Sequence, residues 1–324
     1  MSSWTTTSSE RMASSHSIRK FLSERMAQGG ISSTSLLITL FCDAVTQHGG
    51  EIWLGSLIRS LAPLGISERL VRTAVFRLVQ DDWLVSRKQG RRSYYGLSPS
   101  GFKQYQRAAR RIHTSRRPEW DGVWTLVIPS FVDEDKREPL RKGLLWQGFG
   151  LLSPGVYAMP SQDRKSLHEL LNELDLRDSV VIMTARADES GNGDALRRQV
   201  MERWNLAELG EQYQSFLDRY QPVLRYLSGK GAPDPERAFL LRTLLIHDYR
   251  RILLRDPELP LDMLPNNWAG FDAHNLTAEI YKCVGAGSAT WFSNTMKNAA
   301  GSLPPAGAVF FRRYGGIPKR CCFQ

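Results

Sequence analysis

The alternation of apolar and polar residues is most regular between Ile66 and Gln80, where it has the period of an α-helix. One side forms an apolar stripe that we expect to be buried, made of Leu70, Val71, Ala74, Val75 and Leu78. The opposite side is polar and basic, and carries Arg69, Arg72, Thr73, Phe76 and, at its edge, Arg77. Ser67 precedes the pattern and is a favourable N-cap. The pattern therefore predicts an amphipathic helix with a basic outer face.

A basic hairpin is predicted directly after this helix. Two apolar pairs, 84–85 and 94–95, flank a Gly-centred segment made of Arg87, Lys88, Gln89, Gly90, Arg91 and Arg92. This arrangement is typical of two antiparallel strands, and we expect a connecting loop longer than the tightest turns.

The elements upstream complete a recognisable order. Residues 34–47 predict a helix ended by glycines, 51–54 a short strand or helix entry, and 55–64 a second helix. Helix, helix, turn, helix and hairpin is the order of a winged helix-turn-helix, in which the third helix is the recognition helix and the hairpin is the wing. A helix over 102–112 and a linker over 114–118 follow.

The pattern changes after this linker. A strand over 124–128, a helix over 136–147, two short strands within 148–160, a helix over 163–174 and a strand over 180–184 are predicted. This β-α-β-β-α-β order is ferredoxin-like. Helices are then predicted over 195–204, 206–227, 235–254 and 274–298, followed by a tail with one short strand at most.

The expected fold class is thus multidomain α+β: a winged helix-turn-helix, a ferredoxin-like α/β domain and a helical C-terminal domain. We expect these domains over 31–115, 119–190 and 195–316, after a disordered or short helical lead over 1–30 whose first 16 residues are rich in Ser and Thr.

The net charge of +10 is confined to one part of the chain. Between Ser67 and Arg117 there are 13 Lys and Arg but 3 Asp and Glu, so this window holds the whole positive excess and the rest of the 324 residues is balanced. A local basic excess beside a balanced remainder is typical of a module that binds a polyanion.

Cysteine usage and hydropathy narrow the location. None of the four cysteines forms a C-x-x-C pair or a Cys/His cluster with zinc-like spacing, which fits a reducing cytoplasm. No apolar run reaches the ~18 residues of a membrane span, and the N-terminus has no apolar core like that of a secretory signal. We expect a cytoplasmic protein with no membrane contact, cofactor or metal.

The basic helix and hairpin carry the candidate chemistry. Arginine can donate two hydrogen bonds to guanine, at O6 and N7, and threonine can contact a thymine methyl group or a phosphate. Arg69, Arg72 and Thr73 are therefore candidates for base reading, and Arg91 and Arg92 for phosphates or the minor groove. The full DNA-binding set is Arg69, Arg72, Thr73, Arg77, Arg87, Lys88, Arg91 and Arg92. The alternative is a solvated basic helix of an ordinary α/β domain.

A competing hypothesis places metal chemistry in the middle segment. Three consecutive acids, 133–135, follow its first strand, as in metal-dependent nucleases of ferredoxin-like fold. Acids before a helix also cap it and interact favourably with its dipole. The chain has no G-x-S-x-G, H-E-x-x-H, P-loop or strand-linked G-x-G-x-x-G motif. We therefore expect that the protein is not an enzyme. The alternative is a metal-dependent nuclease of ferredoxin-like fold that a winged helix directs to DNA.

Eight stretches along the chain together form a pattern: GGEIWLGSLI (49–58), ERLVRTAVFRL (68–78), GRRSYYGLS (90–98), WDGVW (120–124), LLWQGFG (144–150), RAFLLRTLLIHDYRR (237–251), WAG (268–270) and RRYGG (312–316). Together they resemble the PaaX-type transcriptional repressors of phenylacetic acid degradation operons. The resemblance implies a repressor of phenylacetate catabolism that an acyl-CoA effector, phenylacetyl-CoA, releases from its operator. Repression rather than activation rests on this resemblance alone.

Such an effector joins an aromatic acyl group to an anionic nucleotide, so its site needs aromatic side chains and Lys or Arg. The candidates are Arg141, Lys142, Trp146, His247, Arg250, Arg251 and Trp268. Arg250 and Arg251 could instead pair with an internal acid or face water, and the tryptophans could be core residues. Two-fold operators on double-stranded DNA also lead us to expect a homodimer.

Overall fold

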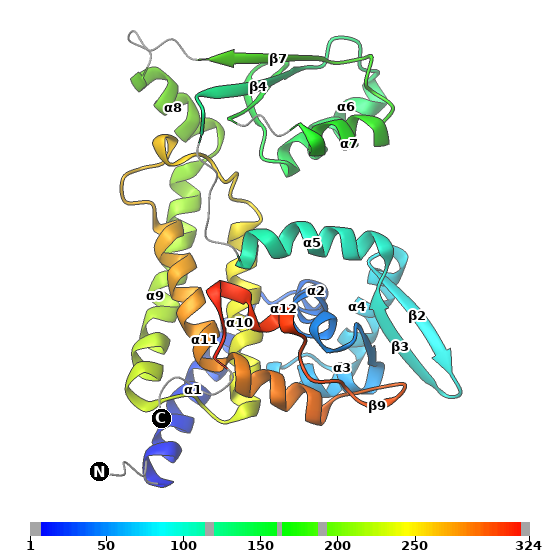
Figure 1. Cartoon of the computed structure of the whole chain (residues 1–324), viewed down its shortest axis with the longest axis vertical. Helices are drawn as coiled ribbons and strands as arrows, with labels where there is room; N and C mark the ends of the chain where they lie inside the picture. Colours follow the sequence, from blue (N-terminus) through cyan, green and yellow to red (C-terminus); the bar gives the residue numbers. More distant parts are fainter. Residues whose placement is uncertain (1–7, 114–119, 161–163, 187–192, 319–324) are drawn as a thin grey trace. The chain divides into compact units, whose positions relative to one another are not determined.

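The computed structural model describes residues 8–113, 120–160, 164–186 and 193–318 (Figure 1). They form two compact units. The first contains the described residues of 1–115, 215–251 and 271–324, and the second those of 116–214 and 252–270. The predicted linker 114–118 lies outside the described residues, as do the first seven residues of the expected lead.

The first unit begins with helices and a small sheet. Its elements are α1 (Ser8–Ala27), α2 (Ser33–Asp43), β1 (Glu51–Trp53), α3 (Leu54–Leu61), α4 (Glu68–Gln80), β2 (Leu84–Gln89), β3 (Arg92–Leu97) and α5 (Pro99–His113). The three strands form an antiparallel sheet in the order β1-β3-β2. Helix α1 begins at Ser8, so the described part of the expected lead contains a helix, one of the two alternatives that the sequence left open.

Helix α4 confirms the amphipathic prediction with one correction. Its backbone begins at the predicted cap, where the Ser67 hydroxyl accepts a hydrogen bond from the Leu70 amide at 3.4 Å. Four members of the predicted stripe are buried, namely Val71, Ala74, Val75 and Leu78. Leu70 is instead 47% exposed. Each residue turns a helix by 100°, and Leu70 is one residue off the stripe that Val71 and Ala74 define.

The hairpin turn is tighter than predicted. Gln89 on β2 pairs with Arg92 on β3, so the strands are joined by only two residues, Gly90 and Arg91. Gly90 has φ +60°, a left-handed conformation that glycine adopts without steric strain. The basic residues 87, 88 and 92 therefore lie in the strands, and the side chains of Arg87 and Arg92 contact residues of β1.

Helices make up the rest of the first unit. They are the second part of α9 (Leu206–Lys230), most of α10 (Pro235–Leu253), most of α11 (Ala269–Thr295) and the short α12 (Ala308–Phe311). A small hairpin, β8 (Lys297–Asn298) and β9 (Gly301–Ser302), follows α11. Apolar and aromatic side chains fill this core, among them Phe216, Tyr220, Phe239, Leu244, Tyr249, Ile280 and Phe292. The tail prediction was wrong, because α12 is helical.

The second unit is built on a four-stranded sheet. Its elements are β4 (Val123–Ile128), α6 (Glu134–Trp146), β5 (Gly150–Ser153), β6 (Val156–Met159), α7 (Lys165–Glu173), β7 (Val181–Arg186) and α8 (Gly193–Arg203). The strand order is β5-β6-β4-β7, and all neighbouring strands are antiparallel. Helices α6 and α7 lie on one side of the sheet (Figure 1). The element order is the predicted one.

The core of this unit lies between the sheet and α6 and α7. Val127, Tyr157 and Ile182 come from the sheet, and Leu140, Leu144, Leu167 and Leu171 from the two helices. No helix among the described residues is long and apolar enough to cross a membrane.

Candidate nucleic-acid interface and ligand-binding residues

The outer face of α4 presents two predicted base-reading residues to solvent. Arg69 and Thr73 are both exposed and lie one helical turn apart. The Thr73 hydroxyl donates to the Arg69 carbonyl at 3.0 Å, which directs its proton to the backbone. The side chains of Arg69 and Arg77 make no hydrogen bond or ion pair with another described residue. Both guanidinium groups are therefore available to an external acceptor.

Arg72 differs from Arg69 because it has a partner on its own helix. Its Nε and Nη2 donate to Glu68 Oε1 at 2.8 and 2.7 Å, and both side chains are more than half exposed. Exposed i,i+4 pairs of this kind stabilise a helix by only ~0.3–0.5 kcal/mol. Arg72 can therefore exchange Glu68 for a base or phosphate at little cost.

Two of the four basic side chains in the hairpin pair or stack with another described side chain, and two do not. Arg87 forms a bidentate ion pair with Glu51 of β1, at 2.8 and 2.7 Å, and lies 5.3 Å from the Tyr94 ring centre. Arg92 stacks over Trp53 at 4.9 Å. The side chains of Lys88 and Arg91 make no hydrogen bond or ion pair within the described part of the chain. Of the four, these two have no side-chain partner among the described residues.

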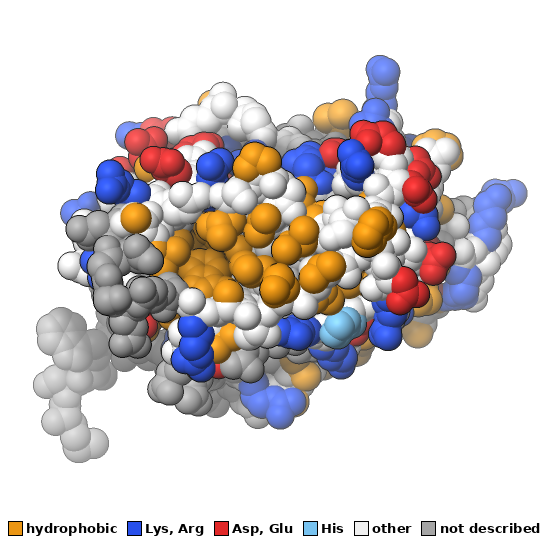
Figure 2. All heavy atoms as spheres, turned by 90° about the horizontal axis from the view of Figure 1, so that it is seen from above, with side chains coloured by type: hydrophobic (Ala, Val, Ile, Leu, Met, Phe, Trp, Pro, Cys, Tyr) orange, Lys and Arg blue, Asp and Glu red, His pale blue; other side chains and the backbone are white. Residues whose placement is uncertain are grey.

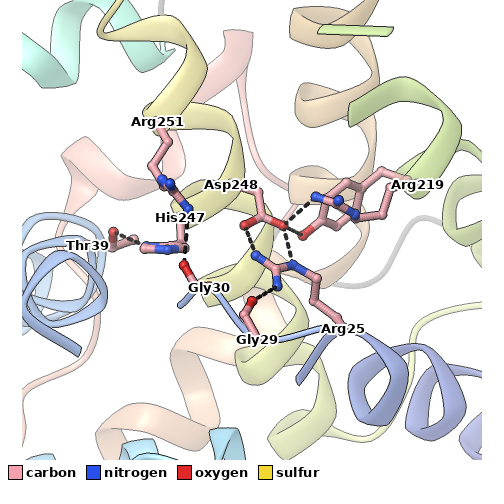
Figure 3. A network of polar contacts seen from close by, with 9 residues as sticks. Arg25, Gly29, Gly30, Thr39, Arg219, His247, Asp248 and Arg251 are labelled. Carbon is pink, nitrogen blue, oxygen red and sulfur yellow. Dashed lines mark hydrogen bonds and ion pairs between the residues drawn. The ribbon is translucent and has the colours of Figure 1, made fainter. Parts of the chain in front are cut away.

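Three of the predicted effector residues hold the N-terminal segment onto α10, and Figure 3 shows two of them, His247 and Arg251. His247 Nδ1 lies 3.4 Å from Thr39 Oγ1 of α2. Arg250 Nη1 donates to Ser35 O at 3.2 Å and to Thr39 Oγ1 at 3.0 Å. Arg251 Nη1 donates to Gly30 O at 3.4 Å. The α10 segment thus binds the first helix of the predicted winged-helix region.

Burial changes the ionisation of two of these side chains. Loss of hydration lowers the pKa of His247 to about 4, although the Asp248 charge opposes this shift. Burial also lowers the pKa of Arg250. At neutral pH His247 is therefore neutral.

The next residue of α10, Asp248, anchors α1 (Figure 3). Arg25 donates from Nε and Nη2 to the two carboxylate oxygens of Asp248 at 2.8 and 2.7 Å, and both residues are buried. Tyr220 donates to Asp248 Oδ2 at 3.0 Å, and Arg219 lies 3.4 Å from it. Burial opposes ionisation of Asp248, but the hydrogen bonds and charge of Arg25 outweigh it and hold its pKa below the usual value.

A second buried charge cluster was missed by the sequence reasoning. Asp43 at the end of α2 accepts from Arg313 Nη1 at 2.6 Å and from Tyr281 OH at 2.8 Å, and Arg242 Nε lies 3.0 Å from its other oxygen. Arg242 stacks 5.2 Å from the Phe310 ring. Both arginines and Asp43 are at most 4% exposed. Isolated charges within the apolar stretches 36–45 and 238–246 were the available signal.

The remaining effector candidates lie on the second unit. Arg141 and Lys142 on α6 are exposed and both pair with Glu138, and the hydrogen bond from Arg141 lowers the pKa of Glu138 to about 2. Trp146 is 60% exposed, so it is no core residue. Trp268 is buried and packs edge-on against Tyr213, with ring centres 5.8 Å apart. These residues belong to the second unit, whereas the α10 residues His247, Arg250 and Arg251 belong to the first.

The three acids 133–135 begin α6. Asp133 is at the N-cap position, although its side chain makes no capping hydrogen bond, and Glu134 pairs with Arg137 at 2.8 Å. Within the described ranges, no group of three metal-ligating side chains occurs.

Part of one face of the sheet in the second unit is apolar and exposed, whereas Trp124 on the same face is buried beside Trp204. Val127 and Ile182 point into the core, so their strand neighbours point away from α6 and α7. Leu126 pairs with Met183 on this outer face, and Ile128 pairs with Val181. Met183 is 50% exposed and Val181 43%. Figure 2 looks onto this unit and shows apolar side chains across the middle of a face with charged groups around its rim.

Comparisons with known proteins extend along most of the chain. Residues 32–101 match the PaaX-like protein family, 117–197 the PaaX protein central Cas2-like domain, and 204–294 the PaaX-like protein C-terminal domain. The transcriptional repressor PaaX of Escherichia coli K12 is 40% identical over 290 residues, which cover 89% of this chain and 91% of that protein.

A solved structure also matches. An uncharacterised protein of Mycobacterium tuberculosis aligns with a TM-score of 0.50 and 24% identity, covering 79% of this chain and 97% of the other. This likeness concerns the fold alone. The family matches, together with the long alignment to the Escherichia coli repressor, lead to one conclusion: this chain belongs to the PaaX family of transcriptional repressors.

Proposed function

We propose that the chain represses genes of aromatic, phenylacetate-type catabolism by binding operator DNA through a winged helix-turn-helix over 31–115. The observation that carries this proposal is the exposed basic face of α4 beside the basic β2–β3 hairpin. The helix has the width and polarity to enter a major groove, and the hairpin would be the wing. The ferredoxin-like strand order supports a middle domain over 119–190, followed by a helical domain over 195–316. Because a repressor must reach the DNA that it regulates, we propose a cytoplasmic location.

Within this interface the side chains have different roles. Arg69 and Thr73 read base edges, and Arg72 joins them after leaving Glu68. Lys88 and Arg91 bind phosphates, because their charges have no partner among the described residues. Arg87 and Arg92 contribute less than was expected, because Glu51 neutralises the first and Trp53 holds the second.

A pair of arginine substitutions tests this division. Arg69→Ala is expected to weaken binding to the operator by roughly 1–3 kcal/mol and to leave binding to a scrambled duplex unchanged. Arg91→Ala is expected to weaken both equally and to make the salt slope shallower by about one. Fluorescence anisotropy at several salt concentrations measures both, with an operator obtained by repeated selection from a random duplex pool.

The opposite pattern would reverse the two assignments. An equal loss on both duplexes for Arg69→Ala would make it a phosphate contact, and an unchanged salt slope for Arg91→Ala would remove it from the interface. Incubating the protein and duplex DNA with Mg²⁺ or Mn²⁺ tests the nuclease alternative. That alternative requires cleavage of the duplex, and the cleavage must disappear in Asp133→Ala.

We further propose phenylacetyl-CoA as the effector, with Arg141, Lys142 and Trp146 as contacts for its nucleotide. Lys142 and Trp146 are four residues apart, so a cation and an exposed aromatic ring share one side of α6. His247, Arg250 and Arg251 remain candidates for an indirect role, because they already bind the segment that contains α2. Trp268 remains a candidate for an aromatic contact with the effector. The effector must bind the DNA-free state more tightly, since equal affinity would shift nothing.

Titration calorimetry tests the effector and its binding residues together. We expect heat of binding with phenylacetyl-CoA and none with free phenylacetate. In the double variant Arg141→Ala/Lys142→Ala, each phosphate-binding cation removed is expected to raise the Kd roughly tenfold. The exposed Arg177→Ala is the matched control on the same unit. An absence of heat with the thioester would refute the effector assignment and leave DNA binding untouched. Unchanged affinity in the double variant would place the site elsewhere.

Finally, we propose a homodimer in which the outer sheet face of one protomer packs on the same face of its partner. Leu126, Ile128, Val181 and Met183 supply apolar area at the centre, and the charged rim favours one register. A two-fold pairing of identical patches is the commonest protein symmetry and matches two half-sites on DNA.

A further inference from the structure

The exposed face of α4 carries an aromatic ring among its polar and charged groups. Phe76 is 62% exposed, although the helix buries four other apolar residues. Positions 69, 73, 76 and 80 are spaced by four, three and four residues, so a helix of 3.6 residues per turn places them on one line. That line is opposite the stripe formed by Val71, Ala74 and Leu78. Phe76 therefore lies on the same outward line as Arg69 and Thr73.

Phe76 also borders a shallow groove beside the hairpin. The groove has a volume of about 300 Å³ and is lined by Leu54, Arg72, Val75, Phe76, Val79, Ser86 and Tyr95. Ser86 pairs with Tyr95 across β2 and β3, so both belong to one face of the sheet, the face that also carries Lys88. An apolar strip thus runs between the cations of α4 and a cation of the hairpin.

The chemistry of the major groove selects the partner of such a strip. Each base pair presents hydrogen-bond donors and acceptors there, and the 5-methyl group of thymine is the apolar group that distinguishes it. A single exposed apolar side chain is common on protein surfaces and needs no explanation by itself. Phe76 differs because it is on the line of base-reading residues and is flanked by charges that attract DNA.

We infer that Phe76 reads a thymine by packing its ring on the 5-methyl group, making it a specificity-determining residue of the repressor. This inference rests on the proposed entry of α4 into the major groove. Arg69 would read a guanine nearby through hydrogen bonds, and Phe76 would add a preference for thymine over cytosine. Cytosine presents an amino donor and no methyl at the same edge.

Replacing thymine by uracil provides a direct test, because it removes only the methyl group and keeps every hydrogen-bonding atom of the base. Starting from the selected operator, each thymine is replaced in turn and binding is measured by fluorescence anisotropy. The wild-type chain is expected to bind roughly fourfold more weakly at one thymine position per half-site, which corresponds to one buried methyl group. Phe76→Ala is expected to bind the thymine and uracil duplexes equally.

Two further variants make the test specific. Phe76→Leu keeps an apolar contact and should retain part of the thymine preference. Phe102→Ala removes another exposed ring, on α5, and should keep the full preference. Because Phe76 is exposed, its replacement is expected to leave the circular dichroism spectrum and the binding of scrambled duplex unchanged.

The possible failures are distinguishable. If the wild type binds operator and scrambled duplex equally, the proposed base reading fails. If it selects the operator but tolerates uracil at every position, or if Phe76→Ala keeps the wild-type preference, the inference about Phe76 is overturned while base reading by α4 stands.

Discussion

Replacing Met183 by Asp is expected to split the proposed dimer into monomers and to weaken operator binding by roughly 100-fold or more. Met183 is at the centre of the outer sheet face, where it pairs with Leu126 across the strands. In a two-fold interface each aspartate would be buried without a partner and close to its symmetry mate. Burying an unpaired charge costs several kcal/mol, and each 1.4 kcal/mol is a factor of ten.

Sedimentation velocity measures the assembly state, and fluorescence anisotropy with a two-half-site operator measures its effect on DNA. The side chain is half exposed in the single chain, so the substitution should not disturb folding. Leu261→Asp, at another exposed apolar position of the second unit, is the control and should stay dimeric. A dimeric Met183→Asp would place the interface elsewhere, and a monomeric wild type would refute the dimer itself.

Replacing Asp43 by Ala is expected to lower the free energy of unfolding by about 3–5 kcal/mol. The change leaves Arg242 and Arg313 buried, adjacent and without their shared carboxylate. Tyr281 also loses the acceptor of its hydroxyl group. Since a typical domain has a stability of only ~5–15 kcal/mol, the loss would shift the whole unfolding transition.

Urea unfolding followed by circular dichroism provides the measurement, with the midpoint compared at unchanged slope. Asp43→Asn keeps the shape of the side chain but removes its charge, and should lose most of the same stability. Glu24→Ala breaks an exposed pair with Lys20 at 3.8 Å and is expected to change stability by less than ~0.5 kcal/mol. A loss below ~1 kcal/mol for Asp43→Ala would mean that the cluster is hydrated rather than dependent on this carboxylate.

The same cluster illustrates why long-range pairing could not be predicted from the sequence. Asp43 and Arg313 are separated by 270 residues, and Arg25 and Asp248 by 223. A helical period shows which residues share one side of a helix, but it contains no information on what packs against that side. Charges inside apolar stretches indicated that partners must exist, and only packing identified them.

The basic hairpin shows the same limit at shorter range. Its composition predicted the strands and their charge, but Arg87 is paired with Glu51, which is 36 residues earlier on a different strand. Of four basic side chains in the hairpin, this pair engages Arg87, and stacking on Trp53 engages Arg92. The effector candidates on α10 were likewise identified as hydrogen-bonding arginines, and the structure provides them with acceptors on the N-terminal segment.

Local patterns in the sequence determined α4, its N-cap, the hairpin, the β-α-β-β-α-β order and the place of the basic surface. These depend on side-chain spacing and backbone preference over a few residues, which are visible in the chain itself. The tertiary structure decided which charges on that surface have partners, that Leu70 is exposed, and that part of one sheet face is left uncovered. Those properties arise from packing between distant segments, and the free energy of each such interaction depends on neighbours that no local spacing specifies.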